Sequence, residues 1–499
     1  MFLNLLINQA ILKLRICLIF NQKIMKSLHK LVLTLLYVAV LATACNDFGN
    51  LNVSANNPAQ PNTAGLLTGA LTTVGDLATG IVPCLYAQQL GDVTYIEESR
   101  YKTVNFDYAG FYTGPLNALQ NIIKLNTDAD TKTTAAANGS NANQIATARI
   151  LKAYIFLHIT DTWGDIPYSA ALKGQSNFSP IFDKQQDIYT DLFKELKEAA
   201  AQFDGDKSIS GDILFGGDND QWKKFANSIR ALMALRLSKV DAAKGKAEFV
   251  AALTSGVLAS NDDNVQFHFL ADAHYENPIY SNYTTFNRKD YAVSNTLIDI
   301  LKGLNDPRLP AFADEATASA TFVGVPYGVF PPTWKSQEVS LMASSITEQN
   351  SPANVLTYAQ LLFAQAEAAK LGWTTGNAKT LYENAIKASM QQWHVYTAAD
   401  YTTYIAQSKV AYTDAKALEL IGQQRWLALY FQGYDAWTEW RRTGFPALIP
   451  AAKPLNTSGK IPRRFAYPTS EASLNKVNYD AVVARQGADV QETRVWWDK

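Results

Sequence analysis

Two carboxylates and a tryptophan stand close together in the stretch HITDTWGDIPYSAAL, residues 158–172. Asp161 and Asp165 lie four residues apart, on either side of Trp163. A pair of carboxylates can supply the acid and the base of glycoside hydrolysis. The same residues can also form the buried end of a helix, so the surrounding elements decide between the two interpretations.

The local sequence favours the end of a helix. Apolar residues recur at three- and four-residue spacing over 142–163, which predicts a helix there. Gly164 and the Ile166–Pro167 step end it, because a residue before proline avoids the α conformation. Asp161 then lies in the last turn, and Asp165 lies beyond it in an Asx-type turn that closes its own backbone hydrogen bonds. The carboxylates therefore share no helix face, and the tryptophan between them is predicted to fill the core.

Helical patterning dominates the rest of the chain. The spacing of apolar residues predicts further helices over 116–126, 184–203 and 220–240. The clearest unit is a pair of helices over 359–393, with alanines on the first, a turn after Gly372 and large apolar residues on the second. This pattern resembles a tetratricopeptide helical hairpin. We expect a mainly α fold: a single helical domain with tetratricopeptide-like hairpins and long aromatic loops.

The N-terminal part is typical of an exported protein. From Met25 the chain reads MKSLHKLVLTLLYVAVLATAC, with two lysines, a short apolar run, small residues and Cys45. The apolar run is too short to span a membrane comfortably. Its end resembles the lipobox, where a signal peptidase cuts before a cysteine that becomes lipidated; an ordinary secretory peptide cut near Ala44 is the alternative. We predict an extension upstream of the true start (1–24), a lipoprotein signal peptide (25–44), a tether (45–62) and a folded domain (63–499).

Charge and cysteine content exclude several classes of protein. Removal of residues 1–44 changes the net charge from −1 to −6, with 39 basic against 45 acidic side chains. Nucleic-acid binding depends on basic patches, so this acidic chain is a poor candidate for it. Of three cysteines, Cys17 is removed and Cys45 carries the lipid, which leaves Cys84 alone. No intramolecular disulfide and no zinc site built on cysteine pairs is then predicted.

The sequence contains few signals of metal or catalytic chemistry. FGGDNDQW (215–222) resembles part of a calcium loop, but the further oxygen ligands and the distal glutamate of a full loop are missing. We interpret it as a turn with Asp220 as the N-cap of the next helix. No HExxH, G-x-S-x-G or phosphate-binding loop occurs. We therefore predict no catalytic residue, no metal and no cofactor.

A tryptophan-rich helix is predicted near the C-terminus. Trp437 and Trp440 are three residues apart and are expected in the core. Arg441 and Arg442 follow in the last turn before Gly444, where cations complement the free carbonyls of a helix end. We predict a buried face and a basic C-terminal cap for this helix.

Several segments together resemble a known family. They are, in chain order, ILKAYIFLHITDTWGDIPYSAAL, FDKQQDIYTDLFKEL, WKKFANSIRALMALRLS, NDPRLPAF, AEAAKLGW and QQRWLALYFQGYDAWTEWRRTGFP. The match is to the SusD/RagB family of nutrient-binding outer-membrane lipoproteins, in particular its second, SusD-like branch. The resemblance implies a lipid-anchored protein on the cell surface that captures oligosaccharides, or peptides in some relatives. It further implies delivery to a SusC-like TonB-dependent transporter, without catalysis.

Two polar, aromatic segments, 91–115 and 261–352, are the predicted ligand-binding loops. An aromatic ring can stack on the apolar face of a pyranose, while amides and guanidinium groups bind its hydroxyls. Trp334 is the single strongest candidate for a stacking ring. The other candidates are Tyr95, Arg100, Tyr101, Tyr280, Tyr283, Asn287 and Arg288.

Two other functions stay open on the sequence alone. One is an all-α glycosidase or lyase that uses Asp161 and Asp165 as acid and base. The other is a periplasmic tetratricopeptide-like scaffold that binds only proteins. Cleavage of a bound glycan would distinguish the first from a binding protein, and accessibility to protease on intact cells would count against the second.

Overall fold

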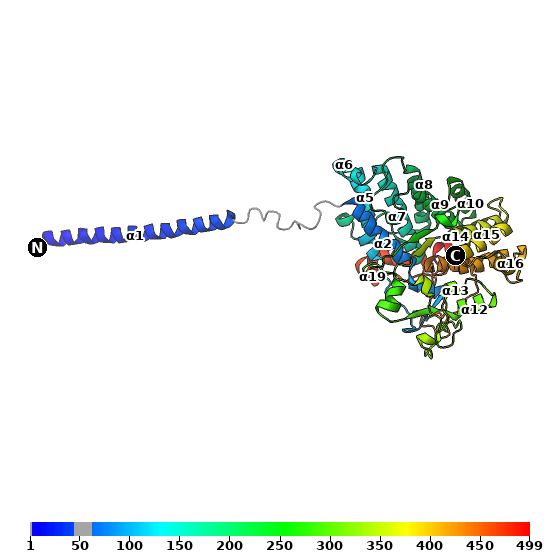
Figure 1. Cartoon of the computed structure of the whole chain (residues 1–499). Helices are drawn as coiled ribbons and strands as arrows, with labels where there is room; N and C mark the ends of the chain where they lie inside the picture. The colour runs from blue at the N-terminus through cyan, green and yellow to red at the C-terminus, as the bar shows by residue number, and fades with distance from the viewer. Residues whose placement is uncertain (1, 44–61) are drawn as a thin grey trace. The chain divides into compact units, whose positions relative to one another are not determined.

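The computed structural model describes residues 2–43 and 62–499, and the chain divides into two units, Met1–Pro61 and Asn62–Lys499. The first unit contains the helix α1 (Phe2–Thr43), whose large apolar side chains, where described, are exposed (Figure 1). The predicted extension and most of the predicted signal peptide fall in α1. Cys45 and the tether up to residue 61 lie outside the described residues, so the lipid anchor stays a prediction.

The second unit is mainly α, as predicted. Its longer helices are α2 (Thr63–Ala78), α3 (Ile81–Tyr86), α5 (Asn117–Thr127), α7 (Asn141–Trp163), α8 (Gln185–Gln202), α9 (Asn219–Arg236), α10 (Ala242–Ser255), α12 (Asn295–Gly303), α14 (Tyr358–Lys370), α15 (Ala378–Gln392), α16 (Ala398–Ala406), α17 (Ala417–Ala428), α18 (Gly433–Thr443), α19 (Thr469–Leu474) and α20 (Lys476–Gln486). Its short helices are α4 (Ala109–Phe111), α6 (Lys132–Ala135), α11 (Pro278–Tyr280) and α13 (Leu309–Phe312).

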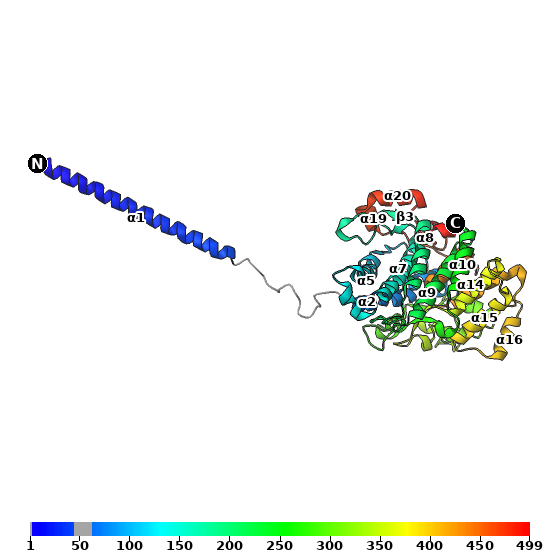
Figure 2. The same cartoon turned by 90° about the horizontal axis from the view of Figure 1, so that it is seen from above.

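In residues 62–499, six short strands form three antiparallel pairs, β1 with β5, β2 with β3 and β4 with β6. They are β1 (Leu90–Asp92), β2 (Ile166–Pro167), β3 (Phe182–Asp183), β4 (Val265–Phe267), β5 (Tyr291–Val293) and β6 (Ala353–Leu356). Helices α7, α8, α9 and α10 each pack against the next, and α14 packs against α9, α15 and α17 (Figures 1 and 2). Within residues 62–499 no sheet is therefore larger than two strands, and the helices form the scaffold.

The pair α14 and α15 forms the hairpin predicted over 359–393. Gly372 follows α14 with φ +71°, a conformation that glycine adopts at little cost. The Asn377 side chain accepts a backbone hydrogen bond (2.9 Å) and caps the start of α15. Ala364 and Ala366 have no exposed surface, so small residues of α14 lie where the neighbouring helices pack closely.

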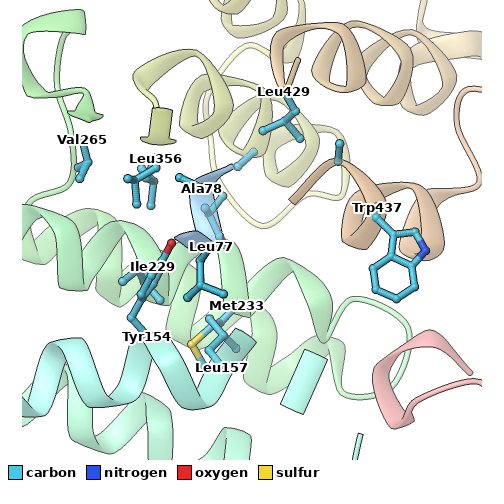
Figure 3. Packing of buried hydrophobic residues seen from close by; sticks show 14 of the residues in the cluster. Leu77, Ala78, Tyr154, Leu157, Ile229, Met233, Val265, Leu356, Leu429 and Trp437 are labelled. Carbon is cyan, nitrogen blue, oxygen red and sulfur yellow. The ribbon is translucent and has the colours of Figure 1, made fainter. Parts of the chain in front are cut away.

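The core lies where α2, α7, α9 and the strands β4 and β6 meet (Figure 3). Leu77 of α2, Leu157 of α7 and Met233 of α9 point into it together, with Leu356 of β6 beside them. Burial of such side chains stabilises the fold by about 1.5–3 kcal/mol each. Helices α2, α7 and α9 and strand β6, which are far apart in sequence, thus share one core.

The stretch Thr63–Tyr86 is, within the described residues, the one helical stretch long and apolar enough to cross a membrane, with a mean hydropathy of 1.3. Half of it is buried inside the folded unit, and Leu71 and Val74 have no exposed surface. Composition alone does not distinguish a buried core helix from a membrane span. The burial identifies α2 as a core helix.

The start of α9 differs from the prediction. The N-cap is Asp218, whose side chain accepts hydrogen bonds from the backbone N–H groups of Asp220 (2.8 Å) and Gln221 (3.1 Å). Asp220 lies in the first turn and pairs with Lys223. The prediction of Asp220 as N-cap was wrong because either aspartate of the DND stretch satisfies the capping pattern.

The tryptophans of α18 are in the core, as predicted, but its arginines are not a surface cap. Arg441 is buried, lies over the Trp437 ring at 3.9 Å, and donates a hydrogen bond to the backbone oxygen of Asp161 (2.7 Å). Arg442 points to α14 and binds Glu367 through two hydrogen bonds of 2.5 Å. The arginines therefore hold α18 against α7 and α14.

Arg442 belongs to a buried ion-pair network that joins three helices. Its guanidinium also binds Glu439 of α18 (2.6 Å), and Arg425 of α17 binds the same carboxylate (2.9 Å). Burial opposes the ionisation of Glu439, but the guanidinium groups of Arg425 and Arg442 hold its pKa at about 2. Glu439 therefore stays charged at neutral pH. With Glu367, the network has four side chains that depend on one another.

Gly433 of α18 lies close to the backbone at α3, and a side chain there should destabilise the protein. A Cβ atom on Gly433 would lie 2.6 Å from the backbone nitrogen of Cys84 and 2.9 Å from the backbone oxygen of Gly80. Overpacking of this kind costs about 1–3 kcal/mol. We expect Gly433→Ala to lower the free energy of unfolding by that amount, which is measured by a lower denaturant midpoint. Gly69→Ala, at an open position of α2, should stabilise slightly, and equal effects of the two variants would contradict the prediction.

Candidate functional site

The two carboxylates around Trp163 have structural partners. Asp161 is buried at the end of α7 and accepts hydrogen bonds from Tyr189, from the indole nitrogen of Trp497 (2.8 Å) and from Arg236, with which it forms an ion pair. Trp163 is buried as predicted, and its indole nitrogen donates to the backbone oxygen of Ala466 (3.0 Å). Asp161 thus anchors the end of the helix.

Asp165 does not close an Asx-type turn, which corrects the prediction. One carboxylate oxygen accepts from the backbone nitrogen of Gln185 at the start of α8 (2.8 Å), and the other accepts from Arg485 of α20 (2.7 Å). Asp165 is also buried. Because these bonds fix both oxygens, neither carboxylate of the stretch 158–172 is presented to a ligand.

The predicted ligand-binding loops meet because β1 and β5 pair in antiparallel register. Asp92, the last residue of β1, lies opposite Tyr291, the first residue of β5. The loop after β1 and the loop before β5 therefore leave the ribbon at the same end. The backbone nitrogens of Val93 and Thr94 both donate to the backbone oxygen of Asp290 (2.7 and 3.3 Å), which extends the contact into the loops.

Tyr95 and Arg288 form the first part of the site. The Tyr95 side chain is 66% exposed, and the Arg288 guanidinium lies 5.5 Å from the centre of its ring. Nε of Arg288 donates to Asp290 (2.6 Å), and Asn282 donates to the same oxygen (2.8 Å). These bonds hold the guanidinium in place, and within the described residues its two terminal nitrogens have no hydrogen-bond partner. An exposed ring beside free N–H donors can bind the face and the hydroxyls of a sugar.

Arg100 and Phe330 form a second pair of a cation and an aromatic ring. The Arg100 guanidinium lies 4.6 Å from the centre of the Phe330 ring, and Phe330 is 46% exposed. Nε of Arg100 donates to the backbone oxygen of Lys453 (2.7 Å). The backbone nitrogen of Leu455 donates to the backbone oxygen of Arg100 (2.6 Å). The segment 448–455 therefore supports this part of the site, in addition to the two predicted ligand-binding loops.

Trp334 is half-buried. It packs against a small apolar cluster of Val93, Ala292, Val325 and Val339, which lies beside the β1–β5 pair. Its indole nitrogen is enclosed and has no hydrogen-bond partner in the described part of the chain. Trp334 thus lies next to the loop of Tyr95, with less of its surface exposed than the sequence indicated. We refer to Tyr95, Arg100, Arg288, Phe330 and Trp334 as the loop site.

Two candidate tyrosines are buried. Tyr101 has no exposed surface, and its hydroxyl accepts from the backbone nitrogen of Ala451 (2.9 Å). Tyr283 is 9% exposed and donates to the backbone oxygen of Tyr291 (2.8 Å). Both side chains anchor loops, so we remove them from the candidate ligand contacts.

The remaining candidates lie at the edge of the loops. Tyr280 is half-buried at the end of α11, and Asn287 is exposed. Asn287 has φ +49°, and Tyr95 and Lys289 also have positive φ (57° and 52°). Non-glycine residues rarely adopt this conformation, and they concentrate at binding and catalytic sites. The backbone of both loops is thus held in strained turns at the loop site.

The Asp92 carboxylate and Ser99 close the loop that follows β1; we call this pair the clamp. Asp92 is buried, and one oxygen accepts from both the backbone nitrogen (2.8 Å) and the hydroxyl (2.6 Å) of Ser99. This joins the two ends of the loop that carries Tyr95. Burial raises the pKa of Asp92 to about 7, with Glu98 and Glu97 adding repulsion.

The clamp predicts a pH dependence of the loop. Because the folded-state pKa of Asp92 is raised above 3.8, its contribution to stability is complete below that value and is lost as the pH rises through about 7. We expect faster hydrogen exchange of residues 93–99 at pH 8 than at pH 6, after correction for the intrinsic rate. Asp92→Asn should remove this difference. The same difference in Asp92→Asn would show that another group is responsible.

Sequence reasoning missed Phe330, the segment 448–455 and the Asp92–Ser99 clamp. In the aromatic segment that contains both residues, Trp334 was predicted as the stacking ring instead of Phe330 because tryptophan has the larger ring. The segment 448–455 is far from the other loops in sequence, and nothing in its composition indicates that it contacts Arg100. The aspartate and serine are seven residues apart in a predicted loop, where no regular periodicity marks two residues as a pair.

Comparison with known proteins gives matches over most of the chain. The second SusD-like family model, described as starch-binding and associating with the outer membrane, matches residues 55–468. A solved structure described as a chitin-binding protein is 29% identical with a TM-score of 0.77, over 88% of this chain and 100% of that chain. A SusD-like protein described as Bacteroidetes AC2a is 27% identical, with a TM-score of 0.75 and coverage of 88% and 100%. A chitin-binding SusD homologue from Flavobacterium johnsoniae is 25% identical, with a TM-score of 0.74 and coverage of 88% and 99%. A comparison with curated proteins gives no match.

Proposed function

Because the chain belongs to the SusD-like family, we propose that it binds oligosaccharides at the cell surface for uptake, without cleaving them. The observation that carries this proposal is the loop site. There, two exposed rings each lie against a guanidinium group, at 5.5 Å for Tyr95 and 4.6 Å for Phe330. Rings that stack on sugar faces, beside donors for sugar hydroxyls, form a site for a carbohydrate chain.

The proposed ligand class is a β-linked or α-linked oligosaccharide, with chitin oligosaccharides as the first to test. Two of the similar structures are described as chitin-binding, which supports this choice. We propose that the bound chain is passed to a SusC-like TonB-dependent transporter in the outer membrane. The family description, which associates its members with the outer membrane, supports this location.

Titration calorimetry of the purified protein with chitohexaose, maltohexaose and an unrelated hexapeptide tests the proposal. We expect binding of at least one oligosaccharide, recovered at unchanged length by mass spectrometry. Shortened products would identify a glycosidase or lyase instead. Binding of the peptide alone would identify a peptide-binding member of the family.

The proposed lipid anchor at Cys45 makes a separate prediction. Cys45→Ala should release the protein from the membrane fraction of cells, because the acyl chains that hold it there can no longer be attached. Fractionation followed by immunodetection measures this, with protease treatment of intact cells to test surface exposure. Retention of the variant in the membrane fraction would contradict the anchor, and protection from protease would favour a periplasmic scaffold.

A further inference from the structure

A second polar and aromatic hollow lies at the C-terminal end of α15. It has a volume of 240 Å³ and is lined by residues that include Gln392, Trp393 and Phe431. None of the loop-site residues lines it. We call it the α15 cavity. Its size is below that of a pocket for a drug-sized ligand, which is about 300–1,000 Å³, and suits a single sugar unit.

Aromatic rings form one wall of the α15 cavity. Trp393 and Phe431 are both half-buried, so each combines a fixed position with some exposed surface. The Trp393 ring is held edge-on against Phe312, with the ring centres 4.8 Å apart. Such a ring is already oriented before a ligand arrives, which lowers the entropy lost on stacking.

Amide side chains form another wall. Gln266 and Asn354 lie opposite each other on β4 and β6, and Nε2 of Gln266 donates to Oδ1 of Asn354 (2.9 Å). Within residues 62–499 the other amide atoms of this pair make no hydrogen bond. One acceptor and one donor are therefore available beside the aromatic wall.

The end of α15 also contains polar atoms without partners. Both amide atoms of Gln392 and the indole nitrogen of Trp393 are enclosed, and no described residue binds them. Enclosed polar groups are nearly always hydrogen-bonded in proteins, so each unpaired group calls for an explanation. A ligand that turns the Gln392 amide into the cavity and pairs with it supplies one.

Two non-glycine residues with positive φ line the cavity, His394 (+56°) and Phe431 (+61°). His394 follows the end of α15, where the backbone nitrogen of Val395 donates to the backbone oxygen of Met390 (3.0 Å), so its conformation is that of an ordinary helix end. Phe431 is held by the Gln89 side chain, which accepts from its backbone nitrogen (3.1 Å). Strain at a residue such as Phe431 concentrates at functional sites.

We propose that the α15 cavity is a second carbohydrate subsite, which binds one N-acetylated sugar unit. The sugar stacks on Trp393 or Phe431, and its acetamido group, which both donates and accepts, pairs with the amides of Gln266, Asn354 and Gln392. The choice of ligand class rests on the proposed function.

The two sites are connected through the rim of the cavity. Ser345 and Pro352 line the cavity, and the segment between them binds the start of the Tyr280 loop. There, the backbone nitrogen of Asn277 donates to the backbone oxygen of Gln349 (2.8 Å). The side-chain amide of Asn277 donates to the backbone oxygen of Ser351 (3.0 Å). The same segment thus borders the cavity and supports one of the loops.

Calorimetry with chitotriose tests the subsite. Three full-length proteins are compared. They are the wild type, the loop-site variant Tyr95→Ala/Arg288→Ala, and that variant with Ser345→Phe added. Ser345 is exposed at the cavity rim, so a phenylalanine there narrows the mouth without touching the core. Gln392→Ala replaces Ser345→Phe in a parallel series, and thermal unfolding checks that each variant is folded.

We expect the loop-site variant to retain one weaker site for chitotriose per molecule, and either cavity substitution to abolish it. Complete loss of binding in the loop-site variant would overturn the subsite while leaving the proposed function intact. Residual binding that survives both cavity substitutions would also overturn it. A wild-type protein that binds no oligosaccharide at all would contradict the proposed function itself.

Discussion

Glu367→Ala is expected to lower the free energy of unfolding by about 3–5 kcal/mol, the usual effect of removing one partner from a buried ion pair. Glu367 accepts two hydrogen bonds of 2.5 Å from Arg442 and lies 3.5 Å from Arg425. Its removal leaves two guanidinium groups in the interior, both bound to the single carboxylate of Glu439. Equilibrium unfolding in urea measures the loss.

Lys370→Ala is the matched control for this variant. Lys370 lies one turn after Glu367 on α14 and pairs with Asp414, whose side chain is 85% exposed. An exposed pair contributes about 0–1 kcal/mol, so this variant should unfold close to the wild type. If Glu367→Ala loses no more stability than Lys370→Ala, the buried network does not hold the helices together.

The second large effect is expected for the loop-site variant Tyr95→Ala/Arg288→Ala. Loss of a ring contact costs about 0.5–1.5 kcal/mol, and loss of a charged hydrogen bond costs about 1.5–3 kcal/mol. Together these weaken the binding of chitohexaose roughly 30-fold or more. Calorimetry measures the affinity. The thermal midpoint should fall only slightly, because Tyr95 and Arg288 are exposed and Asn282 still donates to the buried Asp290 carboxylate (2.8 Å).

Phe178→Ala provides the control for the loop-site variant. Phe178 is an exposed ring (81%) in a segment that contacts α20, where Asn478 donates to the backbone oxygen of Ser179 (3.1 Å). Its loss should leave the affinity unchanged. Equal affinities of the wild type and the loop-site variant would mean that Tyr95 and Arg288 do not contact the ligand.

Helices α5, α7, α8, α9, α14, α15 and α18 could be predicted from the sequence because helical periodicity is a local property. The hairpin α14–α15 and the end of α7 at Gly164 depend on residues within one or two turns of each other. The partners of Asp165 could not be predicted, since they are 20 and 320 residues away. Separation along the chain also explains why the arginines of α18 were interpreted as a cap: Glu367, the partner of Arg442 on α14, is 75 residues away.

The loop site could be predicted only in part. The aromatic and polar composition of two segments predicted the loops that contain Tyr95 and Arg288. It did not predict the three-residue pairing of β1 with β5 that brings these loops together. Tyrosine has the same sequence signal whether it is exposed, as at position 95, or fully buried, as at position 101. Burial is a property of the folded chain, so the buried tyrosines could be excluded only in the structure.

Hydrogen exchange of the wild-type protein with and without chitohexaose tests the location of the binding site most directly. We expect slower exchange in three segments on ligand binding, residues 91–101, 280–291 and 325–334, which carry the loop site. Protection confined to other parts of the chain, in a protein that binds the oligosaccharide, would contradict the assignment of the site.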